Sequence, residues 1–227
     1  SELDDALDTV ERAAGVRAVV LTGAGRAFST GGDIRAWSGM GAEDFAFNWV
    51  RVGHRVFDRL ARLLQPVIAA LNGAALGGGL ELAAAADIRI AAESAKLGLP
   101  EAGLGMVPGW SGTQRLARRF GTQVTRRMAL GGEVFSAGEG VTLGIVDRVC
   151  PDGKALEEAA AYAERVVARG PEASSAVKLM LAVAEGEESA ASVEALAALH
   201  VAETAGLREG VAAFKEKRAP NFKGDRE

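Results

Sequence analysis

A single carboxylate lies within a strongly apolar helical segment. Glu81 belongs to the run LELAAAA (residues 80–86), in which apolar residues surround every face of the predicted helix. A helix that is apolar on all sides is buried, and an ionised carboxylate there costs free energy unless a pocket, a partner or a proton compensates it. Glu81 is therefore the first candidate for acid/base chemistry. The alternative is a structural carboxylate at a helix start, satisfied by backbone N–H groups.

Three consecutive glycines, Gly77, Gly78 and Gly79, stand immediately before this helix. Residues without Cβ atoms can form a turn whose backbone N–H groups face a ligand oxygen at a helix N-terminus. The lysine-containing pattern of a phosphate-binding P-loop is absent. Taken alone, the triplet favours a flexible turn or a close packing contact over an anion-binding turn.

A second glycine-containing loop, residues 28–33 (FSTGGD), follows the first predicted strand as the glycine triplet follows the second. Both loops therefore leave the same end of adjacent strands, where ligands of open α/β sheets collect. Their N–H groups could jointly hold one oxyanion. On local grounds, a Gly-Gly turn capped by Asp33 is an equally good interpretation.

Glu101 follows Pro100 in a loop, where the default interpretation of a carboxylate is exposure to solvent. Together with Glu81, however, it could form the pair of carboxylates that acid/base chemistry at one substrate requires. Other chemistries fit less well. Residues 109–113 (GWSGT) lack the final glycine of a serine nucleophile elbow, and His54 and His200 lie in helical patterns typical of surface or packing residues. The tryptophans at positions 37, 49 and 110 indicate core or pocket lining.

The elements that must position these residues alternate between strand and helix. Short apolar runs predict buried strands at residues 16–21, 67–71, 88–91 and 143–149. Apolar residues at helical spacing predict helices at 3–14, 43–64, 80–86 and 113–120, and residues 92–121 otherwise have the composition of loops.

From residue 154 onward every apolar pattern is helical, over 154–169, 172–184, 188–204 and 207–218. We therefore predict an α/β core over residues 1–150 and an all-helical region over residues 151–227. The apolar stripes of the helical region need a covering surface, and a partner subunit is a natural one.

Composition excludes several classes of function. With 48% hydrophobic and 25% charged residues the chain is typical of a globular protein, and its net charge of −4 argues against a general nucleic-acid binder. One cysteine and two histidines provide neither an intrachain disulfide nor a Cys/His metal cluster. No run approaches the ~18 apolar residues of a membrane span, and the N-terminus is acidic where a signal peptide would be basic. We expect a cytoplasmic protein without a metal and without a membrane segment.

Four ordered blocks resemble the crotonase (enoyl-CoA hydratase/isomerase) superfamily, and enoyl-CoA hydratases most closely. They are VRAVVLTGAGRAFSTGGD, PVIAALNGAALGGGLELAAAADIRIA, LGLPEAGLGMVPGWSGTQRL and EGVAAFKEKRAPNFKG. The resemblance implies a spiral of β-β-α units with a helical C-terminal region that forms homotrimers or homohexamers. It also implies an acyl-CoA thioester as substrate, so that coenzyme A is part of the substrate and no separate cofactor is expected.

The resemblance also implies roles for individual residues. The N–H groups of Gly32 and Gly78 would hold the thioester oxygen, Glu81 would deprotonate water for attack at C3, and Glu101 would deliver a proton to C2. The spacing of the two glutamates is that of the family's hydratases.

Three further residues would contact coenzyme A by the same resemblance. Arg35 would lie near its phosphates, and Phe214 and Lys217 against the nucleotide of a neighbouring subunit. From charge pattern alone, the basic residues around Lys217 are the solvated end of a terminal helix.

The chain departs from the family in two respects. It begins within the family's first helix, so that the opening strands are expected to be absent, and Thr30, Gly32 and Trp110 are not the commonest residues at their positions. Double-bond isomerisation, thioester hydrolysis and non-catalytic CoA or RNA binding remain alternatives to hydration. The intact pair of glutamates favours hydration.

Overall fold

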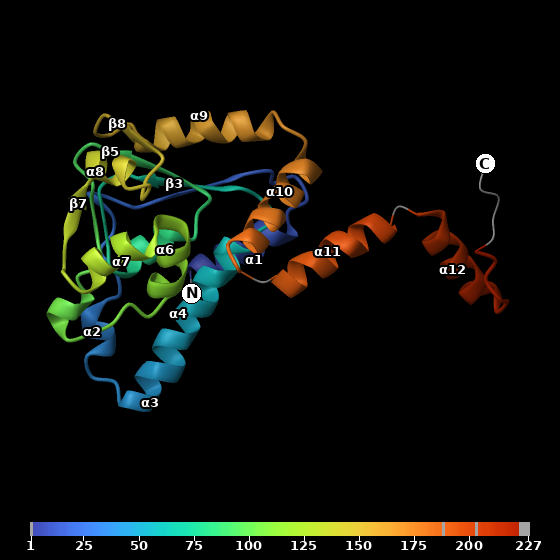
Figure 1. Ribbon diagram of the computed structural model, residues 1–227, viewed down its shortest axis with the longest axis horizontal. Helices are drawn as coiled ribbons and strands as arrows, with labels where there is room; N and C mark the ends of the chain where they lie inside the picture. Colours follow the sequence, from blue (N-terminus) through green and yellow to red (C-terminus); the bar gives the residue numbers. More distant parts are fainter. Residues whose placement is uncertain (1, 188, 203, 223–227) are drawn as a thin grey trace. The chain divides into compact units, whose positions relative to one another are not determined.

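The computed structural model describes residues 2–187, 189–202 and 204–222, and residues 188, 203 and 223–227 of the predicted helical region lie outside these ranges (Figure 1). The chain forms two compact units, Ser1–Ser175 and Ala176–Glu227. The first unit extends beyond residue 150 because α9 (Ala155–Val167) packs against strands of the core.

Two four-stranded sheets form the centre of the first unit. One sheet is entirely parallel, in the order β1 (Val19–Thr22), β3 (Val67–Leu71), β5 (Ile88–Ala92) and β8 (Arg148–Cys150). The other has the order β2 (Ala27–Ser29), β4 (Ala74–Leu76), β6 (Lys96–Gly98) and β7 (Val134–Ser136), with β7 antiparallel to β6. Successive pairs of strands alternate between the sheets and are followed by helices, which confirms the predicted spiral of β-β-α units.

Helices fill the connections between the pairs of strands. In the first half of the unit α1 (Glu2–Arg12) precedes β1, and the connections contain α2 (Ile34–Trp37), α3 (Ala42–Asp44), a π-helical turn (Phe45–Val50), α4 (Arg51–Ala61) and α5 (Gly78–Ala84). A 3-10 turn (Glu101–Leu104), α6 (Gly112–Phe120), α7 (Thr122–Ala129) and α8 (Ala137–Thr142) follow. The predicted helix over residues 43–64 is therefore confirmed, with a π-helical turn in its first half.

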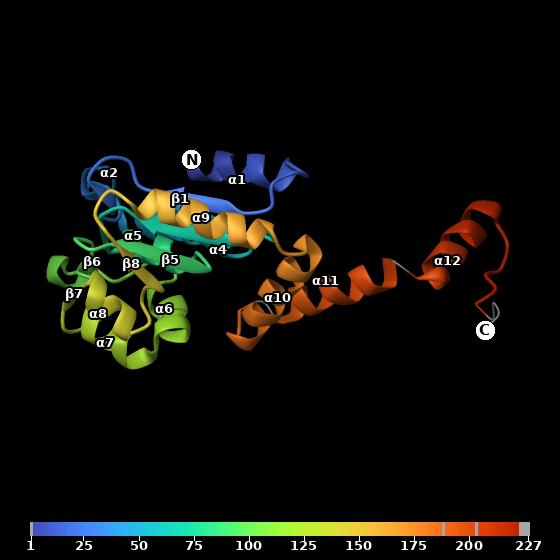
Figure 2. The ribbon, with the colours of Figure 1, turned by 90° about the horizontal axis from the view of Figure 1, so that it is seen from above.

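The continuous apolar run at residues 67–71 gives a strand that is buried on both faces, as predicted. Val67, Ala69 and Leu71 face the main core, whereas Ile68 and Ala70 face a second cluster that includes Ala155 and Ala159 of α9. Figure 2 shows α9 running along this sheet. Burial on both faces fixes β3, and with it the glycine triplet that follows β4.

The sequence prediction was wrong for several short strands. Residues of β2 and β6 were predicted as loop, and no strand was predicted for β4 or β7, because each of these strands spans only three residues, too few for an alternating pattern to be recognised. The predicted strand over residues 143–149 is confined to Arg148–Cys150, since Leu143 ends α8 and residues 144–147 form the connection.

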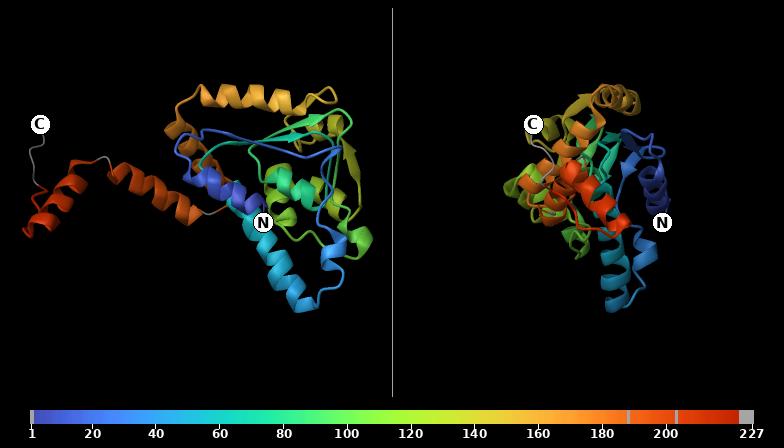
Figure 3. Two further views of the ribbon diagram at one scale, coloured as in Figure 1. Left: turned by 180° about the vertical axis from the view of Figure 1, so that it is seen from behind. Right: turned by 90° about the vertical axis from the view of Figure 1, so that its right-hand side faces the viewer.

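A cluster of charges fixes α4 against α1. Arg59 on α4 contacts carboxylates of Asp4, Asp8 and Glu11 on α1, and Figure 3 shows the two helices together. These groups are partly exposed, so each pair contributes little by itself. The contacts add to the burial of Leu7 and Leu60 in the same interface.

The second unit is helical, as predicted. It contains most of α10 (Pro171–Ala184), then α11 (Ser189–Ala202) and α12 (Ala205–Glu216), whose first turn is capped by Thr204. Several large apolar side chains of this unit are exposed: Val177, Met180, Leu181, Val201, Leu207, Val211, Phe214 and Phe222. The homotrimer or homohexamer stays a prediction. Among the described helices, none has the length and apolar character needed to cross a membrane.

The close approach of β2 to α5 gives a test of the fold. A methyl group on Gly79 would lie 2.0 Å from the backbone oxygen of Ser29, so Gly79→Ala should lower the free energy of unfolding by at least about 2 kcal/mol. Gly138→Ala is the matched control, because nothing lies within 4 Å of its added methyl group and α8 should gain about 0.5–1 kcal/mol. Chemical denaturation of both variants makes the comparison, and equal stabilities would contradict the described packing.

Candidate active site

Four residues selected from the sequence line one cavity of the first unit. The cavity has a volume of about 110 Å³ and is bounded in part by Gly32, Gly78, Glu81 and Glu101. Its wall is mostly apolar and includes Ile34, Val50, Leu104, Met106 and Val107. These residues were not predicted from the sequence, because single apolar residues in short, separate segments form no recognisable pattern. A small apolar cavity with two carboxylates is a typical setting for acid/base chemistry.

Glu81 is buried, as the apolar helix predicted, with 2% of its surface exposed. Its Oε1 accepts hydrogen bonds from the backbone N–H groups of Trp110 and Gly112, each over 2.7 Å. Gly112 is the first residue of α6, so the positive end of that helix faces the carboxylate. The donors come from a distant segment and not from the glutamate's own helix. Oε2 accepts no hydrogen bond within the described ranges and is left for a ligand.

The turn that supplies these N–H groups is strained. Ser111, between the two donors, has a φ of +75°, a left-handed conformation that costs an L residue roughly 1–2 kcal/mol. A methyl group on Gly112 would lie 2.5 Å from Glu81 Oε1, so the close approach of this turn to the carboxylate requires glycine at position 112.

Glu101 is not a solvent-exposed loop carboxylate, and the default interpretation of its position was wrong. It begins the 3-10 turn after Pro100, and its Oε2 is buried with no hydrogen-bond partner in the described part of the chain. A methyl group on Gly77 would lie 2.9 Å from its Oε1. Because Gly77 has no side chain, the Glu101 carboxylate can lie in the cavity beside the start of α5, the helix that carries Glu81.

Burial raises the pKa of both carboxyl groups. The pKa of Glu81 rises to about 7, because burial and the charge of Glu101 outweigh the N–H groups of Trp110 and Gly112 and the charge of Arg115, which lower it. Burial also raises the pKa of Glu101. The larger shift falls on Glu81 because its carboxylate is more deeply buried and faces the charge of the other. The pair can therefore keep a proton near neutral pH.

The two glycine-containing loops meet, as predicted, although they follow other strands than expected. They come after β2 and β4, which are parallel neighbours in the second sheet, and not directly after β1 and β3. A methyl group on Gly31, whose φ is +97°, would lie 3.1 Å from Gly78 N. The N–H groups of Gly32 and Gly78 donate to no acceptor within the described ranges. Asp33 does cap α2 through Arg35 N, so the local alternative for this loop also holds.

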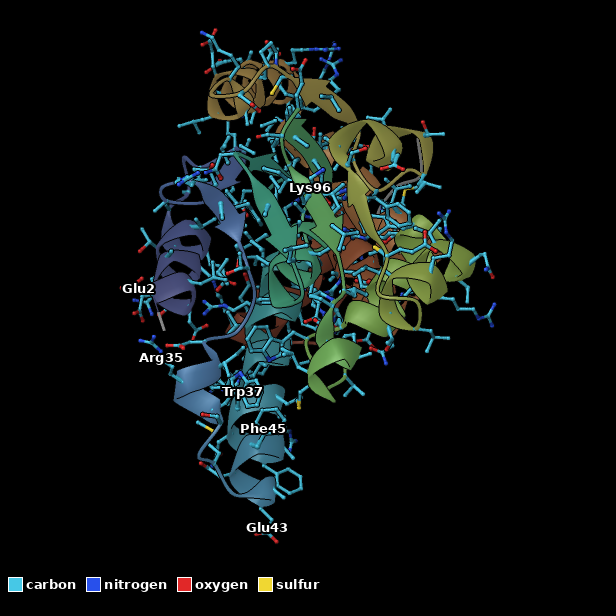
Figure 4. The ribbon with its side chains drawn as sticks, turned by 90° about the vertical axis from the view of Figure 1, so that its left-hand side faces the viewer. Glu2, Arg35, Trp37, Glu43, Phe45 and Lys96 are labelled. Atoms are coloured by element: carbon cyan, nitrogen blue, oxygen red, sulfur yellow. The ribbon has the colours of Figure 1, made fainter. Side chains whose placement is uncertain are left out.

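Aromatic rings form one wall of the cavity, as suggested for the tryptophans. The indole of Trp110 lies between glycines: added methyl groups on Gly32, Gly53 and Gly78 would stand 3.2, 2.2 and 2.6 Å from it. The Trp49 ring packs at 5.8 Å from that of Trp110, and the Trp37 ring at 5.4 Å from that of Phe45. Figure 4 shows Trp37 on α2 beside Phe45, the first residue of the π-helical turn. Such π turns recur at functional sites.

Three residues are expected from the resemblance to contact coenzyme A. Arg35 is exposed on α2, is labelled in Figure 4, and is not among the residues that line the cavity. Phe214 and Lys217 belong to the second unit, where Phe214 is 85% exposed and Lys217 ends α12 with a φ of +54°. Their contact with coenzyme A stays a prediction.

Comparison with known proteins establishes the family. The profile of the family described as Enoyl-CoA hydratase/isomerase matches residues 1–225. The chain is 38% identical to the crotonyl-CoA hydratase of Syntrophomonas wolfei, covering 97% of this chain and 86% of that protein. It is 35% identical to the 2,3-dehydroadipyl-CoA hydratase of Escherichia coli, covering 98% of this chain and 87% of that protein.

A solved structure agrees with these relatives. The crystal structure of an enoyl-CoA hydratase from Bacillus anthracis superposes with a TM-score of 0.80 at 39% identity, covering 99% of this chain and 88% of that one. The chain belongs to the enoyl-CoA hydratase/isomerase family, and the family and fold predicted from its motifs are confirmed.

The raised pKa of Glu81 predicts a pH dependence of stability. Because the folded protein binds this proton more tightly than the unfolded chain, whose carboxyl has its ordinary pKa of 4.5, stability falls as pH rises from about 4.5 to about 7. Glu81→Gln keeps an acceptor for both N–H groups and cannot ionise. Between pH 5 and pH 8 the wild type should lose about 2 kcal/mol relative to this variant. Urea denaturation at both pH values measures the difference, and parallel pH profiles would show that Glu81 is not perturbed.

Proposed function

We propose that the protein is an enoyl-CoA hydratase, which adds water across the C2=C3 double bond of a 2-enoyl-CoA thioester. The observation that carries this proposal is the position of Glu81 and Glu101 on one small cavity, beside two glycine N–H groups without acceptors in the described ranges. Membership of the family and the names of the hydratase relatives support it.

The thioester oxygen would lie against the N–H groups of Gly32 and Gly78. As water attacks C3, negative charge develops on this oxygen, and each N–H donor can contribute roughly 3–4 kcal/mol to the stabilisation of that charge. The apolar and aromatic wall of the cavity strengthens this effect because it excludes water from around the charge.

Glu81 would act as the base toward water through Oε2, because Oε1 already accepts two hydrogen bonds. As Glu81 takes a proton from the water molecule, the water oxygen forms its bond to C3. Glu101 donates the proton that forms the C2–H bond. The larger pKa shift falls on Glu81, whereas this division needs the proton on Glu101. An acyl group that covers the cavity would remove further water from Glu101 and raise its pKa in the required direction.

Further parts of the proposal rest on the family resemblance. Arg35, Phe214 and Lys217 would contact coenzyme A, which is part of the substrate, and the active protein would be a homotrimer or homohexamer. A metal-free site, the absence of nucleic-acid partners and a cytoplasmic location are predictions from composition and charge.

Isomerisation and thioester hydrolysis are the reactions to be distinguished from hydration. Purified protein with crotonyl-CoA should remove the absorbance of the conjugated thioester without releasing free thiol, and 3-hydroxybutanoyl-CoA should form. Conversion of a 3-enoyl-CoA without hydration of crotonyl-CoA would show an isomerase, and release of coenzyme A would show a hydrolase. Either result would overturn the proposal.

Substitution of each glutamate tests the pair. Glu81→Gln and Glu101→Gln should fold and yet hydrate crotonyl-CoA at least about a hundredfold more slowly, because each removes one proton-transferring group. The rates follow from loss of thioester absorbance, and circular dichroism checks the fold. Glu133→Gln is a matched control, since its carboxylate pairs with Arg127 away from the cavity. Wild-type rates in either cavity variant would contradict the assignment.

A further inference from the structure

Ser111 stands between the two residues that hold Glu81. The N–H groups of its neighbours, Trp110 and Gly112, both donate to Glu81 Oε1. Its φ of +75° suits glycine, and among the described residues only Lys217 shares a positive φ without being glycine. A serine in this conformation is retained at a cost in free energy, which contacts of its side chain can offset.

The Ser111 hydroxyl is bound by α4. Its Oγ lies 3.2 Å from Nε2 and 3.3 Å from Nδ1 of His54, and 3.3 Å from Oδ1 of Asp58. The hydroxyl can therefore donate to the carboxylate while it accepts from the ring N–H. His54 Nε2 is itself 3.2 Å from Asp58 Oδ2, one helical turn away. The three side chains form one connected cluster.

Asp58 also binds α6 directly. Arg115, one turn into α6 and 2% exposed, approaches Asp58 Oδ1 to 2.5 Å. The arginines that pair with Asp58 are Arg62, which follows the last residue of α4, and Arg115 of α6, and the His54 ring lies one turn before Asp58 on α4. Through Asp58, α4 holds both the residue before α6 and the first turn of that helix.

The Ser-His-Asp composition does not make Ser111 a nucleophile. The residue is 5% exposed, is not part of the cavity wall, and its Oγ faces α4. A nucleophile must reach the substrate carbonyl, and the group that reaches the cavity here is the carboxylate of Glu81. The cluster instead contacts the turn at residues 110–112, whose N–H groups bind the Glu81 carboxylate, and so it can fix the conformation of that turn.

We propose that Ser111, His54 and Asp58 are positioning residues, which hold residues 110–112 so that two backbone N–H groups bind Glu81 Oε1 and leave Oε2 for water. The inference rests on the proposed function in giving Glu81 the role of base. It goes beyond it in assigning the alignment of that base to a side-chain cluster outside the cavity.

The cluster should control the ionisation of Glu81. Hydrogen bonds to a carboxylate favour its charged form, so loss of their alignment raises the pKa of the group. The charged groups that act on Glu81 are Glu101 from the 3-10 turn and Arg115 from α6, and Ser111→Ala replaces neither side chain. Ser111→Ala removes the hydroxyl and keeps the strained backbone. Its Glu81 pKa should rise by about 0.5 to 1 pH unit, a roughly three- to tenfold change in the ionisation constant.

The test is a ¹³C NMR titration of protein labelled at the glutamate carboxyl carbons, with the Glu81 resonance assigned by its loss in Glu81→Gln. Ser136→Ala is the matched control, because the Ser136 hydroxyl, like that of Ser111, donates to a carboxylate just before a helix. Its partner is Glu139 of α8, whose backbone N–H group it also accepts from. The Glu81 pKa should rise in Ser111→Ala and stay unchanged in Ser136→Ala. Should Ser111→Ala fail to fold, His54→Gln replaces it, since 43% of that side chain is exposed.

Hydration of crotonyl-CoA is followed across pH in the same proteins. The acidic limb of kcat/KM should move to higher pH in Ser111→Ala, with kcat at pH 7 reduced about fivefold and KM little changed. An unchanged Glu81 pKa in a folded Ser111→Ala protein would overturn the inference, whatever the activity. A raised pKa in a protein that hydrates no enoyl-CoA would uphold the positioning role and overturn the proposed function.

Discussion

Glu81 carries a carboxylate inside a buried apolar helix, and the surrounding structure has to compensate for its lost hydration. Two backbone N–H groups and the N-terminus of α6 do so at Oε1, at distances of 2.7 Å. Because these donors lie about thirty positions further along the chain, the carboxylate joins α5 to α6 and determines where the intervening loop must run. That segment, which also contains β5 and β6, carries Glu101 and the part of the apolar wall formed by Leu104, Met106 and Val107.

Close backbone approach is the second constraint, and it explains the glycines. Gly79 passes too near Ser29 for any side chain, Gly112 passes near Glu81, and Gly53 and Gly78 flank the indole of Trp110. The indole of Trp110 thus occupies space that side chains at positions 53 and 78 would otherwise fill. The positive φ of Gly77 places the glycine triplet against Glu101. The triplet therefore connects the strand pair β2–β4 to both carboxylates. The N–H groups of Gly32 and Gly78, which donate to no acceptor in the described part of the chain, lie in the two loops that follow these strands.

Much of the fold and of the site could be predicted from the sequence, because apolar patterns that extend over many residues determine secondary structure whatever the tertiary contacts. The burial of Glu81, the two-faced strand at residues 67–71 and the C-terminal helices all follow from apolar periodicity. Three-residue strands could not be recognised, since too few residues carry the pattern. The burial of Glu101 and the contacts of Ser111 with α4 were also missed. They depend on residues brought together by the fold, and the one available signal was a serine beside a glycine-rich turn.

The central claim is that the two glutamates act at different carbons, Glu81 at C3 and Glu101 at C2. It can be tested without hydration, by exchange of the C2 hydrogens of butanoyl-CoA with D₂O, observed by NMR. This saturated thioester needs only a base at C2 and support for the enolate oxygen. The account predicts that Glu81→Gln retains exchange and that Glu101→Gln loses it. Loss of exchange in Glu81→Gln together with its retention in Glu101→Gln would contradict the account.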